Sequence, residues 1–527
     1  MLDIIIENGV VADGTGAKIF AADIGVSGDK IVAIGDLKET RSHDRLDASG
    51  MVVAPGFVDI HTHSDFSLLA YGSAESQAMQ GVTFEVVGNC GHSCAPIGKT
   101  LNPKNLTIGY DPLVKINWRT FDGYLSRLEK TKLGVNVASL VGHGTLRHAV
   151  MRGEPRPATD GETAAMRTLL EASLEQGAVG FSSGLEYNPG KAARSEEVAE
   201  LCRVVGRRGS FYATHVRNRD VFYESGFGEA LACARVSGAR LQISHIVTKF
   251  GAPRHAMEHT LEMVDWSKRE GLDVAFDMIP HNWSPTMVCA MLPIWAFEGG
   301  IGRLLRRLKS PKEREKMRYN PMPIWQLVPA GRWRDILIFN SPNDPAQCGL
   351  TLAEIAKRRG KKDVTDMLFD LLLEEGEQLM ELTWIGRNFA EADNKTVLAE
   401  SDCAVISDGI TVTGKDRSKV FSPSVCGWSI RFLQRYVRDM NLMTLEEGVR
   451  RMTGLPAARL GIKNRGIIAK KCFADIAVFS YEKLRDRSTV KNPARHPAGI
   501  HHVLVNGQFA VKNGKRTGVN NGRVVRA

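Results

Sequence analysis

Four histidines, one cysteine and one aspartate stand where the sequence could carry metal chemistry. The first two, His61 and His63, end the apolar run of GFVDIHTHSD and lie two residues apart. Successive side chains of a strand point to opposite faces, so both imidazoles leave the strand on the same side. Two imidazoles that converge at the end of a barrel strand suit a Zn2+ ion. A lone His-x-His is a weak signal, but the apolar run behind it, after Pro55-Gly56, strengthens it.

Cys90 follows the next buried-looking run, in VVGNCGHSCAP. Free cysteine is most often a small buried hydrophobe. As a thiolate it would instead be a soft, charged ligand that can hold one zinc or bridge two. Cys94 is an alternative ligand, although the Ala-Pro after it favours a thiol in a loop.

Three later apolar runs also end in polar side chains: His215 in FYATHVRN, His245 in ISHIVTKFG and Asp408 in AVISDG. A single histidine at such a place is more often structural. Four histidines and a cysteine at strand ends together indicate a metal site. A carboxylate at the same mouth can contact the metal and take a proton from its water. We therefore predict hydrolysis by metal-activated water, with Asp408 as general acid/base and no serine or cysteine nucleophile.

Eight strand-like apolar runs, each followed by a helical pattern, would position these residues. This alternation predicts a closed parallel (β/α)8 barrel over residues 55–464. The runs are Phe57–Ile60, Thr83–Val87, Asn136–Val141, Ala178–Ser182, Ser210–Thr214, Arg240–Ser244, Asp273–Asp277 and Cys403–Ser407. The stretch between the last two is far longer than one helix needs, which predicts an inserted subdomain or lid at about 282–400.

Both ends of the chain contain short strands joined by turns. LDIIIENGVVADG near the start and HHVLVNGQFAVKNGK near the end alternate β-branched residues with Gly, Asn and Asp, and Asn506-Gly507 is a strong hairpin signal. We expect residues 1–54 and 465–527 to form one small β-sandwich domain.

The composition is that of an ordinary globular protein, 43% hydrophobic and 24% charged. The net charge of +10 comes from basic residues spread along the chain without a nucleic-acid-binding motif, so we expect no nucleic-acid partner. The nine scattered cysteines suit reduced thiols. Neither a signal-peptide pattern nor a run of the ~18 apolar residues needed to cross a membrane is found. We therefore expect a cytoplasmic enzyme without membrane contact, and leave open whether it forms a homo-oligomer.

The motifs resemble those of the amidohydrolase superfamily and, more closely, the D-aminoacylase (N-acyl-D-amino-acid deacylase) family. The matching stretches run nearly end to end: PGFVDIHTHSD, GVTFEVVGNCGHSCAP, GFSSGLEYNPG, ATHVRN, ISHIVTKFG, ISDG, RMTGLPAARLGI and ADIAVF. Asn-Cys-Gly is the most specific, because most of the wider superfamily places a carboxylated lysine or a glutamate where this family has a bridging cysteine.

The resemblance implies a tightly held zinc at Cys90, His215 and His245. It implies a second, weaker metal site at His61 and His63, with Cys90 and Asp408 shared. It also gives Asp408 the catalytic acid/base role. Tyr187 in SSGLEY matches a residue that lines the family's pocket.

Three substrate-binding stretches of the family differ in this chain. A Tyr-Pro-Tyr stretch is replaced by Ile279-Pro280-His281. The lysine two residues after the sixth-strand histidine is replaced by Val247, with Lys249 as a candidate substitute. A His-Pro-Arg stretch, whose arginine grips the substrate carboxylate, is replaced by Ser422-Pro423-Ser424. Because an arginine clamp is a bidentate, charge-assisted contact, its loss weakens the expected binding of a free amino-acid carboxylate.

We therefore expect a linear amide substrate that needs no free α-carboxylate, such as an N-acyl or N-aryl amide with apolar groups. The candidate substrate-binding residues are Tyr187, Lys249, His281, Trp283, Ser424, Trp428 and His143. His143 is equally well explained as a structural, hydrogen-bonded histidine.

Three alternative functions remain open. One is an N-acyl-D-amino-acid deacylase in the strict sense. Another is a cyclic-amide hydrolase of the hydantoinase type, which needs a lysine where Cys90 stands. The third is a catalytically dead barrel, although such proteins usually lose metal ligands and every expected ligand is present here.

Overall fold

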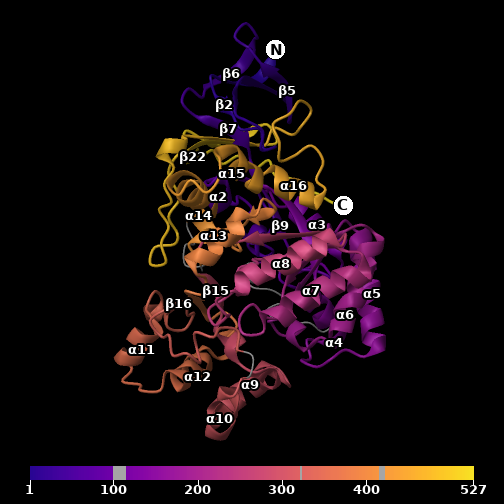
Figure 1. Ribbon diagram of the computed structural model, residues 1–527, viewed down its shortest axis with the longest axis vertical. Helices are drawn as coiled ribbons and strands as arrows, with labels where there is room; N and C mark the ends of the chain where they lie inside the picture. Colours follow the sequence, from indigo (N-terminus) through magenta and orange to yellow (C-terminus); the bar gives the residue numbers. More distant parts are fainter. Residues whose placement is uncertain (99–113, 321–322, 415–421) are drawn as a thin grey trace.

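The computed structural model describes residues 1–98, 114–320, 323–414 and 422–527. Its centre is a sheet of eight parallel strands in the order β18-β14-β13-β12-β11-β10-β9-β8 (Figure 1). They are β8 (Phe57–Asp59), β9 (Val82–Val87), β10 (Asn136–Gly142), β11 (Gly180–Gly184), β12 (Phe211–His215), β13 (Arg240–Ile243), β14 (Val274–Met278) and β18 (Cys403–Val405). All eight lie on the predicted apolar runs, which confirms the predicted α/β barrel.

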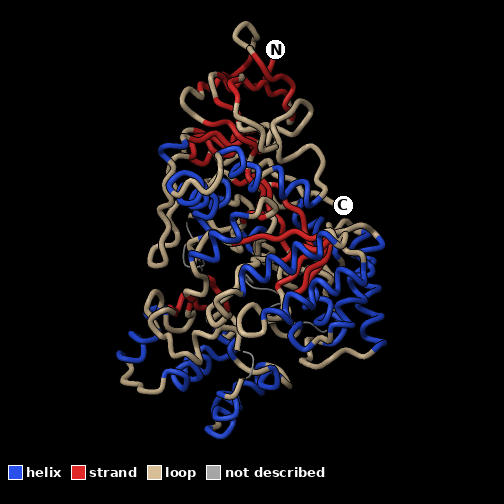
Figure 2. The backbone as a smooth tube through the Cα atoms, viewed as in Figure 1, coloured by secondary structure: helices blue, strands red, loops and turns tan. Residues whose placement is uncertain are grey.

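Helices connect consecutive strands and surround the sheet (Figure 2). Those between strands are α1 (Ser67–Ala70), α2 (Glu75–Ala78), α3 (Phe121–Glu129), α4 (His143–Met151), α5 (Asp160–Glu175), α6 (Ser195–Arg207), α7 (Tyr223–Ser237), α8 (Ala256–Arg269) and α13 (Glu391–Ala399). After β18 come α14 (Ser424–Arg431), α15 (Leu445–Met452) and α16 (Gly454–Leu460). Strands covered in this way are buried on both faces, which is why they read as continuous apolar runs.

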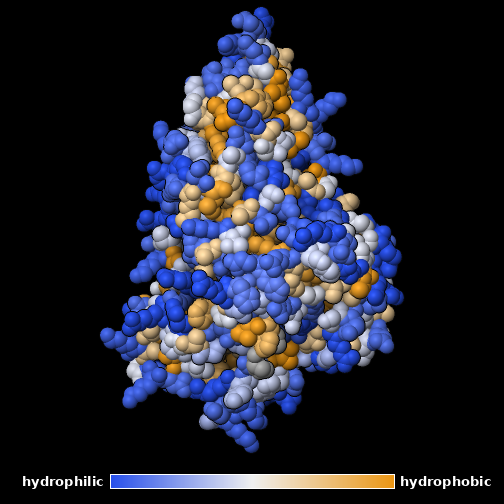
Figure 3. Space-filling model, viewed as in Figure 1, coloured by the Kyte–Doolittle hydropathy of each residue, from blue (hydrophilic) through white to orange (hydrophobic). Residues whose placement is uncertain are grey.

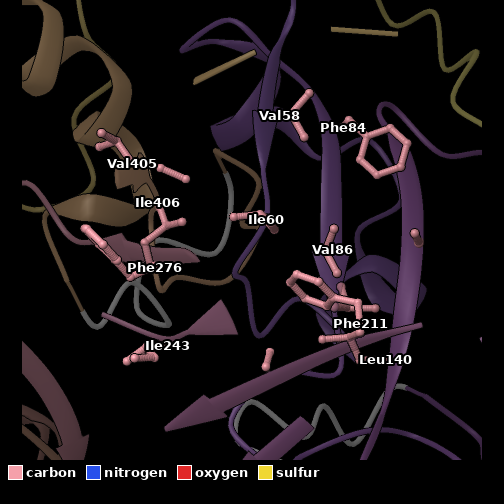
Figure 4. Close-up of a cluster of buried hydrophobic side chains, with 14 of the residues drawn as sticks. Val58, Ile60, Phe84, Val86, Leu140, Phe211, Ile243, Phe276, Val405 and Ile406 are labelled. Atoms are coloured by element: carbon pink, nitrogen blue, oxygen red, sulfur yellow. The ribbon is translucent and has the colours of Figure 1, made fainter. Parts of the chain in front are cut away.

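Apolar side chains from different strands pack together inside the molecule. Figure 4 shows Val58, Phe84, Leu140, Phe211 and Phe276 in one cluster, although they come from five strands. All five are at most 2% exposed. The barrel is therefore a packed core and not a pore, and polar side chains can gather where the strands end.

The barrel closes between β8 and β18 through the residues just beyond these strands. The backbone N–H of Asp408 donates to the carbonyl of His61 at 3.1 Å, and that of His63 donates to Gly409 at 2.7 Å. Thr62 and Gly409 form an isolated parallel bridge. The two segments that carry predicted metal ligands at the ends of the first and last strands are thus joined backbone to backbone at this seam.

The two ends of the chain meet in a pair of sheets above the barrel (Figure 1). One has the order β5 (Lys30–Gly35), β4 (Asp23–Ser27), β1 (Leu2–Glu7), β6 (Ser42–Asp47). The other has the order β22 (Lys515–Arg516), β21 (Gln508–Lys512), β20 (Ile500–Val505), β19 (Ile476–Phe479), β7 (Val52–Pro55), β2 (Val10–Val11), β3 (Phe20–Ala21). Side chains of both sheets, among them Ile4, Ile24, Val53 and Ile476, share one buried apolar cluster.

Between β14 and α13 the chain builds a unit with an apolar cluster of its own (Figure 1). A three-stranded antiparallel sheet has the order β15 (Ser284–Met287), β17 (Thr383–Gly386), β16 (Ile336–Asn340). It is accompanied by α9 (Ile301–Lys309), α10 (Pro311–Arg318), α11 (Leu352–Arg358) and α12 (Val364–Glu375). The next helix, α13, lies within the range expected for the insertion, yet its Val397 and Leu398 pack in the barrel core. We refer to residues 284–386 as the insert.

On the face drawn in Figure 3, hydrophilic residues predominate and hydrophobic ones are scattered among them. In the described part of the chain, no helix is both long enough and apolar enough to cross a membrane.

Gly184, the last residue of β11, packs directly against the backbone after β9. A Cβ atom at this position would lie 2.0 Å from the carbonyl oxygen of Cys90. Because backbone cannot rotate away as a side chain can, we expect Gly184→Ala to lower the free energy of unfolding by about 1–3 kcal/mol. Thermal unfolding followed by circular dichroism measures this.

The matched control is Gly302→Ala in helix α9, where an added Cβ would meet nothing within 4 Å. There alanine should be neutral or stabilise by up to about 1 kcal/mol, since it favours helix more than glycine does. Equal unfolding midpoints for Gly184→Ala and the wild type would contradict the close approach.

Candidate metal centre

The predicted ligands lie at the carboxyl ends of five barrel strands. His61 and His63 follow β8, Cys90 follows β9, and His215 is the last residue of β12. The other two, His245 and Asp408, follow β13 and β18. All are buried except Asp408, whose side chain is 14% exposed. Parallel strands bring these ends to one mouth, as the sequence predicted.

Three of these residues have left-handed backbone, which non-glycine residues seldom adopt. The φ angles are 50° at Cys90, 37° at His245 and 49° at Asp408. Each such residue costs on the order of 1–3 kcal/mol and persists only where its surroundings enforce it. At each of these three ends the chain therefore turns sharply at the residue whose side chain enters the site.

Two groups of candidate ligands share the thiol of Cys90. One consists of His61, His63, Cys90 and Asp408, and the other of Cys90, His215 and His245. Within each group the ligand atoms all lie within 4.8 Å of one another. Cys94 belongs to neither group, and burial raises the pKa of its thiol well above the ordinary value.

Cys90 Sγ is the point on which three imidazoles converge. It lies 3.3 Å from His61 Nε2, 3.7 Å from His215 Nδ1 and 3.6 Å from His245 Nε2. A tetrahedral zinc ion with ordinary Zn–S and Zn–N bonds separates the sulfur and nitrogen atoms by about 3.6 Å. The thiolate and imidazole donors therefore match zinc in chemical type and in spacing.

Electrostatic interactions at this end of the barrel keep the thiol and the carboxyl group of the site anionic. These two buried negative charges require positive charge nearby. Burial alone would raise the pKa of the Cys90 thiol, but the three histidines around it hold that pKa well below its ordinary value. Burial likewise opposes ionisation of Asp408, but His61 and His63 keep the pKa of its carboxyl well below the usual range.

The same interactions act in reverse on the two histidines of the first strand. Burial lowers their pKa, but Cys90 and Asp408 outweigh it and raise the pKa of His61 well above its ordinary value and that of His63 to about 9. In the other group, burial and the nearby Arg219 lower the pKa of His245 to about 3, so this imidazole stays neutral. A divalent cation would supply the required positive charge and leave all the imidazoles neutral for coordination.

A buried carboxylate lies behind one ligand. Glu186 Oε2 is 2.7 Å from His215 Nε2, on the side of the ring that faces away from Cys90. Glu186 Oε1 accepts a hydrogen bond from Lys249 Nζ at 2.5 Å. Burial raises the pKa of Glu186, but Lys249 and His215 outweigh it and lower this pKa to about 2.

Asp277 on β14 contacts two further ligands. Its Oδ1 accepts a hydrogen bond from the backbone N–H of His245 at 2.6 Å and lies 3.8 Å from His61 Nδ1. Gln242 donates to its Oδ2 at 2.8 Å. Burial raises the pKa of Asp277 to about 6. This carboxyl joins one residue of each ligand group.

A cavity opens from the ligands toward the insert. Its empty volume is about 440 Å³. It is lined by His63, Cys90, Tyr187, Pro285, Thr286, Met287, Thr383 and Asp408. Four of these eight residues come from β15 and β17 of the insert, so the insert forms the wall opposite the candidate ligands. None of the eight is lysine or arginine.

Of the seven candidate substrate-binding residues, only Tyr187 is among these lining residues. Its ring contacts that of His215, with the centroids 4.7 Å apart. The ammonium group of Lys249 is engaged by Glu186 and by the carbonyl of Ile324. His143 Nε2 lies 2.7 Å from Glu197, in a buried ion pair with Arg147.

The other four candidates are likewise not among the residues that line this cavity. His281 is 4% exposed and Trp428 is fully buried. The hydroxyl groups of Ser422 and Ser424 are 2.8 Å apart. Trp283 carries the guanidinium of Arg387 over its ring, 5.4 Å from the centroid. Contact of these four residues with substrate stays a prediction.

Sequence reasoning missed Glu186, Asp277 and the four insert residues. For Glu186 and Asp277 a signal existed, because each is a carboxylate at or just after the end of a predicted strand. Pro285, Thr286, Met287 and Thr383 carry no such signal, since only long-range packing of the insert brings them to the mouth.

Comparisons with known proteins agree with this geometry. A model of the amidohydrolase family matches residues 44–308 and 403–511, more than half of the chain. An N-acyl-D-glutamate deacylase from Alcaligenes xylosoxydans xylosoxydans is 35% identical over 511 residues, which cover 96% of this chain and 93% of that protein.

Two solved structures are similar over the full length of both chains. The N-acyl-D-glutamate deacylase from Bordetella bronchiseptica, complexed with zinc and a phosphonate inhibitor, has a TM-score of 0.82 and 32% identity. A D-aminoacylase with a binuclear metal centre has a TM-score of 0.83 and 32% identity. This chain therefore belongs to the amidohydrolase family, as a relative of the D-aminoacylases and N-acyl-D-amino-acid deacylases.

Proposed function

We propose that the protein is a zinc-dependent hydrolase of linear amides, with Asp408 as general acid/base. The observation that carries this proposal is the pair of ligand groups that share Cys90, with Asp408 at the edge of the cavity. Cys90, His215 and His245 would hold a tightly bound zinc, and His61, His63, Cys90 and Asp408 a second, weaker one. When bound, zinc supplies Lewis-acid chemistry, which acidifies water and polarises a carbonyl group.

Asp408 has the position and the charge for proton transfer. Its Oδ1 lies 3.1 Å from His63 Nε2 and 3.3 Å from His61 Nε2, contacts that keep the carboxylate ionised. It is also the most exposed of the candidate ligands and faces the cavity. In the proposed reaction water adds to the amide carbon, and Asp408 takes its proton. The C–N bond then breaks, and Asp408 returns the proton to the leaving nitrogen, which gives a carboxylic acid and an amine that ionise to a carboxylate and an ammonium ion.

The cavity suits a neutral substrate with apolar groups. Pro285 and Met287 offer apolar surface, while Tyr187, Thr286 and Thr383 offer hydroxyl groups. None of the described lining residues can pair with a substrate carboxylate as a lysine or arginine would. Lys249, the substitute that the sequence suggested, already neutralises Glu186. We therefore favour N-acyl or N-aryl amides without a free α-carboxylate.

Strict N-acyl-D-amino-acid deacylase activity is the second candidate. The identity of 35% to an N-acyl-D-glutamate deacylase over nearly the whole chain favours it. The two candidates share the metal centre and differ only in what binds beside the scissile amide.

Replacement of Asp408 tests the acid/base role. We expect Asp408→Asn to lower kcat by about 10²–10⁴-fold, the usual contribution of a general acid/base, while the zinc held by Cys90, His215 and His245 remains. Amide hydrolysis and elemental zinc analysis of the purified variant measure the two effects. The control is Asp402→Asn, at the opposite end of the same strand, which should leave kcat unchanged. Full activity of Asp408→Asn would refute the assignment.

The substrate class is tested with two compounds that differ in one group. N-acetyl-D-leucinamide has a carboxamide where N-acetyl-D-leucine has a carboxylate. Without an arginine clamp we expect kcat/KM to favour the carboxamide by about tenfold, equivalent to about 1.4 kcal/mol. Equal or better turnover of the N-acetyl-D-amino acid would instead support the strict deacylase.

The ionised thiol of Cys90 allows a test of metal binding without substrate. In a Cys348→Ser background, which removes the exposed cysteine, we expect iodoacetamide to alkylate Cys90 first in the metal-free protein. The rate should stay flat from about pH 6 to about pH 9, because the thiol is already ionised. Zinc should protect it. Peptide mass spectrometry identifies the modified residue, and an alkylation rate that zinc does not change would contradict coordination by this thiol.

A further inference from the structure

The four histidines of the metal centre differ in what holds their second ring nitrogen. The ring of His215 has Nδ1 facing Cys90 Sγ, and its Nε2 is within hydrogen-bond distance of the Glu186 carboxylate. The buried Nδ1 atoms of His61, His63 and His245 have no hydrogen-bond partner among the described residues. Among the described residues, His215 is therefore the one histidine of the site whose second ring nitrogen is within hydrogen-bond distance of a carboxylate, since Asp277 Oδ1 lies 3.8 Å from His61 Nδ1.

Glu186 is fixed in turn by a buried cation. Lys249 Nζ lies 2.5 Å from Glu186 Oε1 and 3.6 Å from Asp220 Oδ2. The side chains of Lys249 and Glu186 are only 1% and 5% exposed. A charge buried to this degree is poorly screened by water, so each partner strongly constrains the other.

We infer that Glu186 and Lys249 are positioning residues for the zinc ligand His215, an inference that rests on the zinc centre of the proposed function. The Glu186 carboxylate accepts a hydrogen bond from the protonated Nε2 of His215, which leaves the lone pair of Nδ1 directed toward Cys90. Lys249 keeps Glu186 charged and in place. A carboxylate behind a ligating histidine makes the ring a stronger donor and holds it in the coordinating orientation.

The same lysine joins the metal centre to the insert. Lys249 Nζ donates a hydrogen bond to the carbonyl of Ile324 at 2.6 Å, and Ile324 lies between β15 and β16. Residues of β15 and β17 form the cavity wall. One continuous chain of contacts therefore runs from Cys90 through His215, Glu186 and Lys249 into the insert, which lines the cavity.

The test measures metal binding in the full-length protein. We expect Glu186→Gln, which keeps the shape of the side chain and removes its charge, to weaken zinc binding by about 10–100-fold. Competition with a chromophoric chelator gives the affinity. In the cobalt-substituted protein, the visible d–d absorption bands should shift, since they report ligand orientation and do not depend on activity.

The control is a second buried carboxylate in the same kind of setting. Glu197 lies between His143 Nε2, at 2.7 Å, and Arg147, at 2.6 Å, but it touches no residue of either ligand group. We expect Glu197→Gln to leave the zinc affinity and the cobalt spectrum unchanged. An equal loss of zinc affinity in Glu197→Gln would overturn the inference, because the effect would then reflect general destabilisation.

The double variant Glu186→Gln/Lys249→Met covers the case in which the single variant does not fold, because it removes both members of the ion pair. It should bind zinc as weakly as Glu186→Gln. Wild-type zinc affinity in these variants, with amide hydrolysis intact, would overturn this inference alone. A wild-type protein that takes up no zinc would overturn the proposed function as well.

Discussion

Two anionic donors converge in a buried mouth, and the rest of the site is arranged around their need for positive charge. The thiolate of Cys90 and the carboxylate of Asp408 both lie out of bulk water, where an unpaired charge is costly. Protons on His61 and His63 satisfy that need in one way, and a metal ion satisfies it in another. The strained backbone at Cys90, His245 and Asp408 shows that the fold bears a cost to bring these groups together.

The barrel and the insert contribute different parts of the candidate site. The barrel ends provide the candidate ligands, while β15 and β17 provide the surface opposite them. The apolar cluster of the insert includes Cys90 and Tyr187, so the insert packs directly against the candidate metal centre. Substitutions at Met287 or Thr383 would therefore alter the cavity wall without altering a candidate ligand.

The barrel and its ligands could be predicted because both leave local traces in the sequence. Strands buried on both faces are continuous apolar runs, and a polar residue at the end of such a run, like His215 or Asp408, is conspicuous. The cavity wall could not be predicted in this way. The position of the insert depends on contacts between distant residues, such as the hydrogen bond that Lys249 Nζ donates to the carbonyl of Ile324 at 2.6 Å. Lys249 illustrates the same limit, because its motif placed it near the pocket while its partner Glu186 was not expected to be a counter-ion.

The seam between β8 and β18 links the candidate metal centre to the stability of the barrel. Here the barrel is joined by the backbone of the segments that carry His61, His63 and Asp408, with the Asp59 carboxylate accepting the backbone N–H of Ser407 at 3.2 Å. A metal ion held by side chains from both segments would cross-link the first and last strands at the point where the barrel closes. A closed barrel stays intact only while each strand remains paired with both of its neighbours. Metal occupancy would then affect how readily the barrel unfolds. The lifetime of the folded protein would depend on whether the metal that catalysis requires is bound.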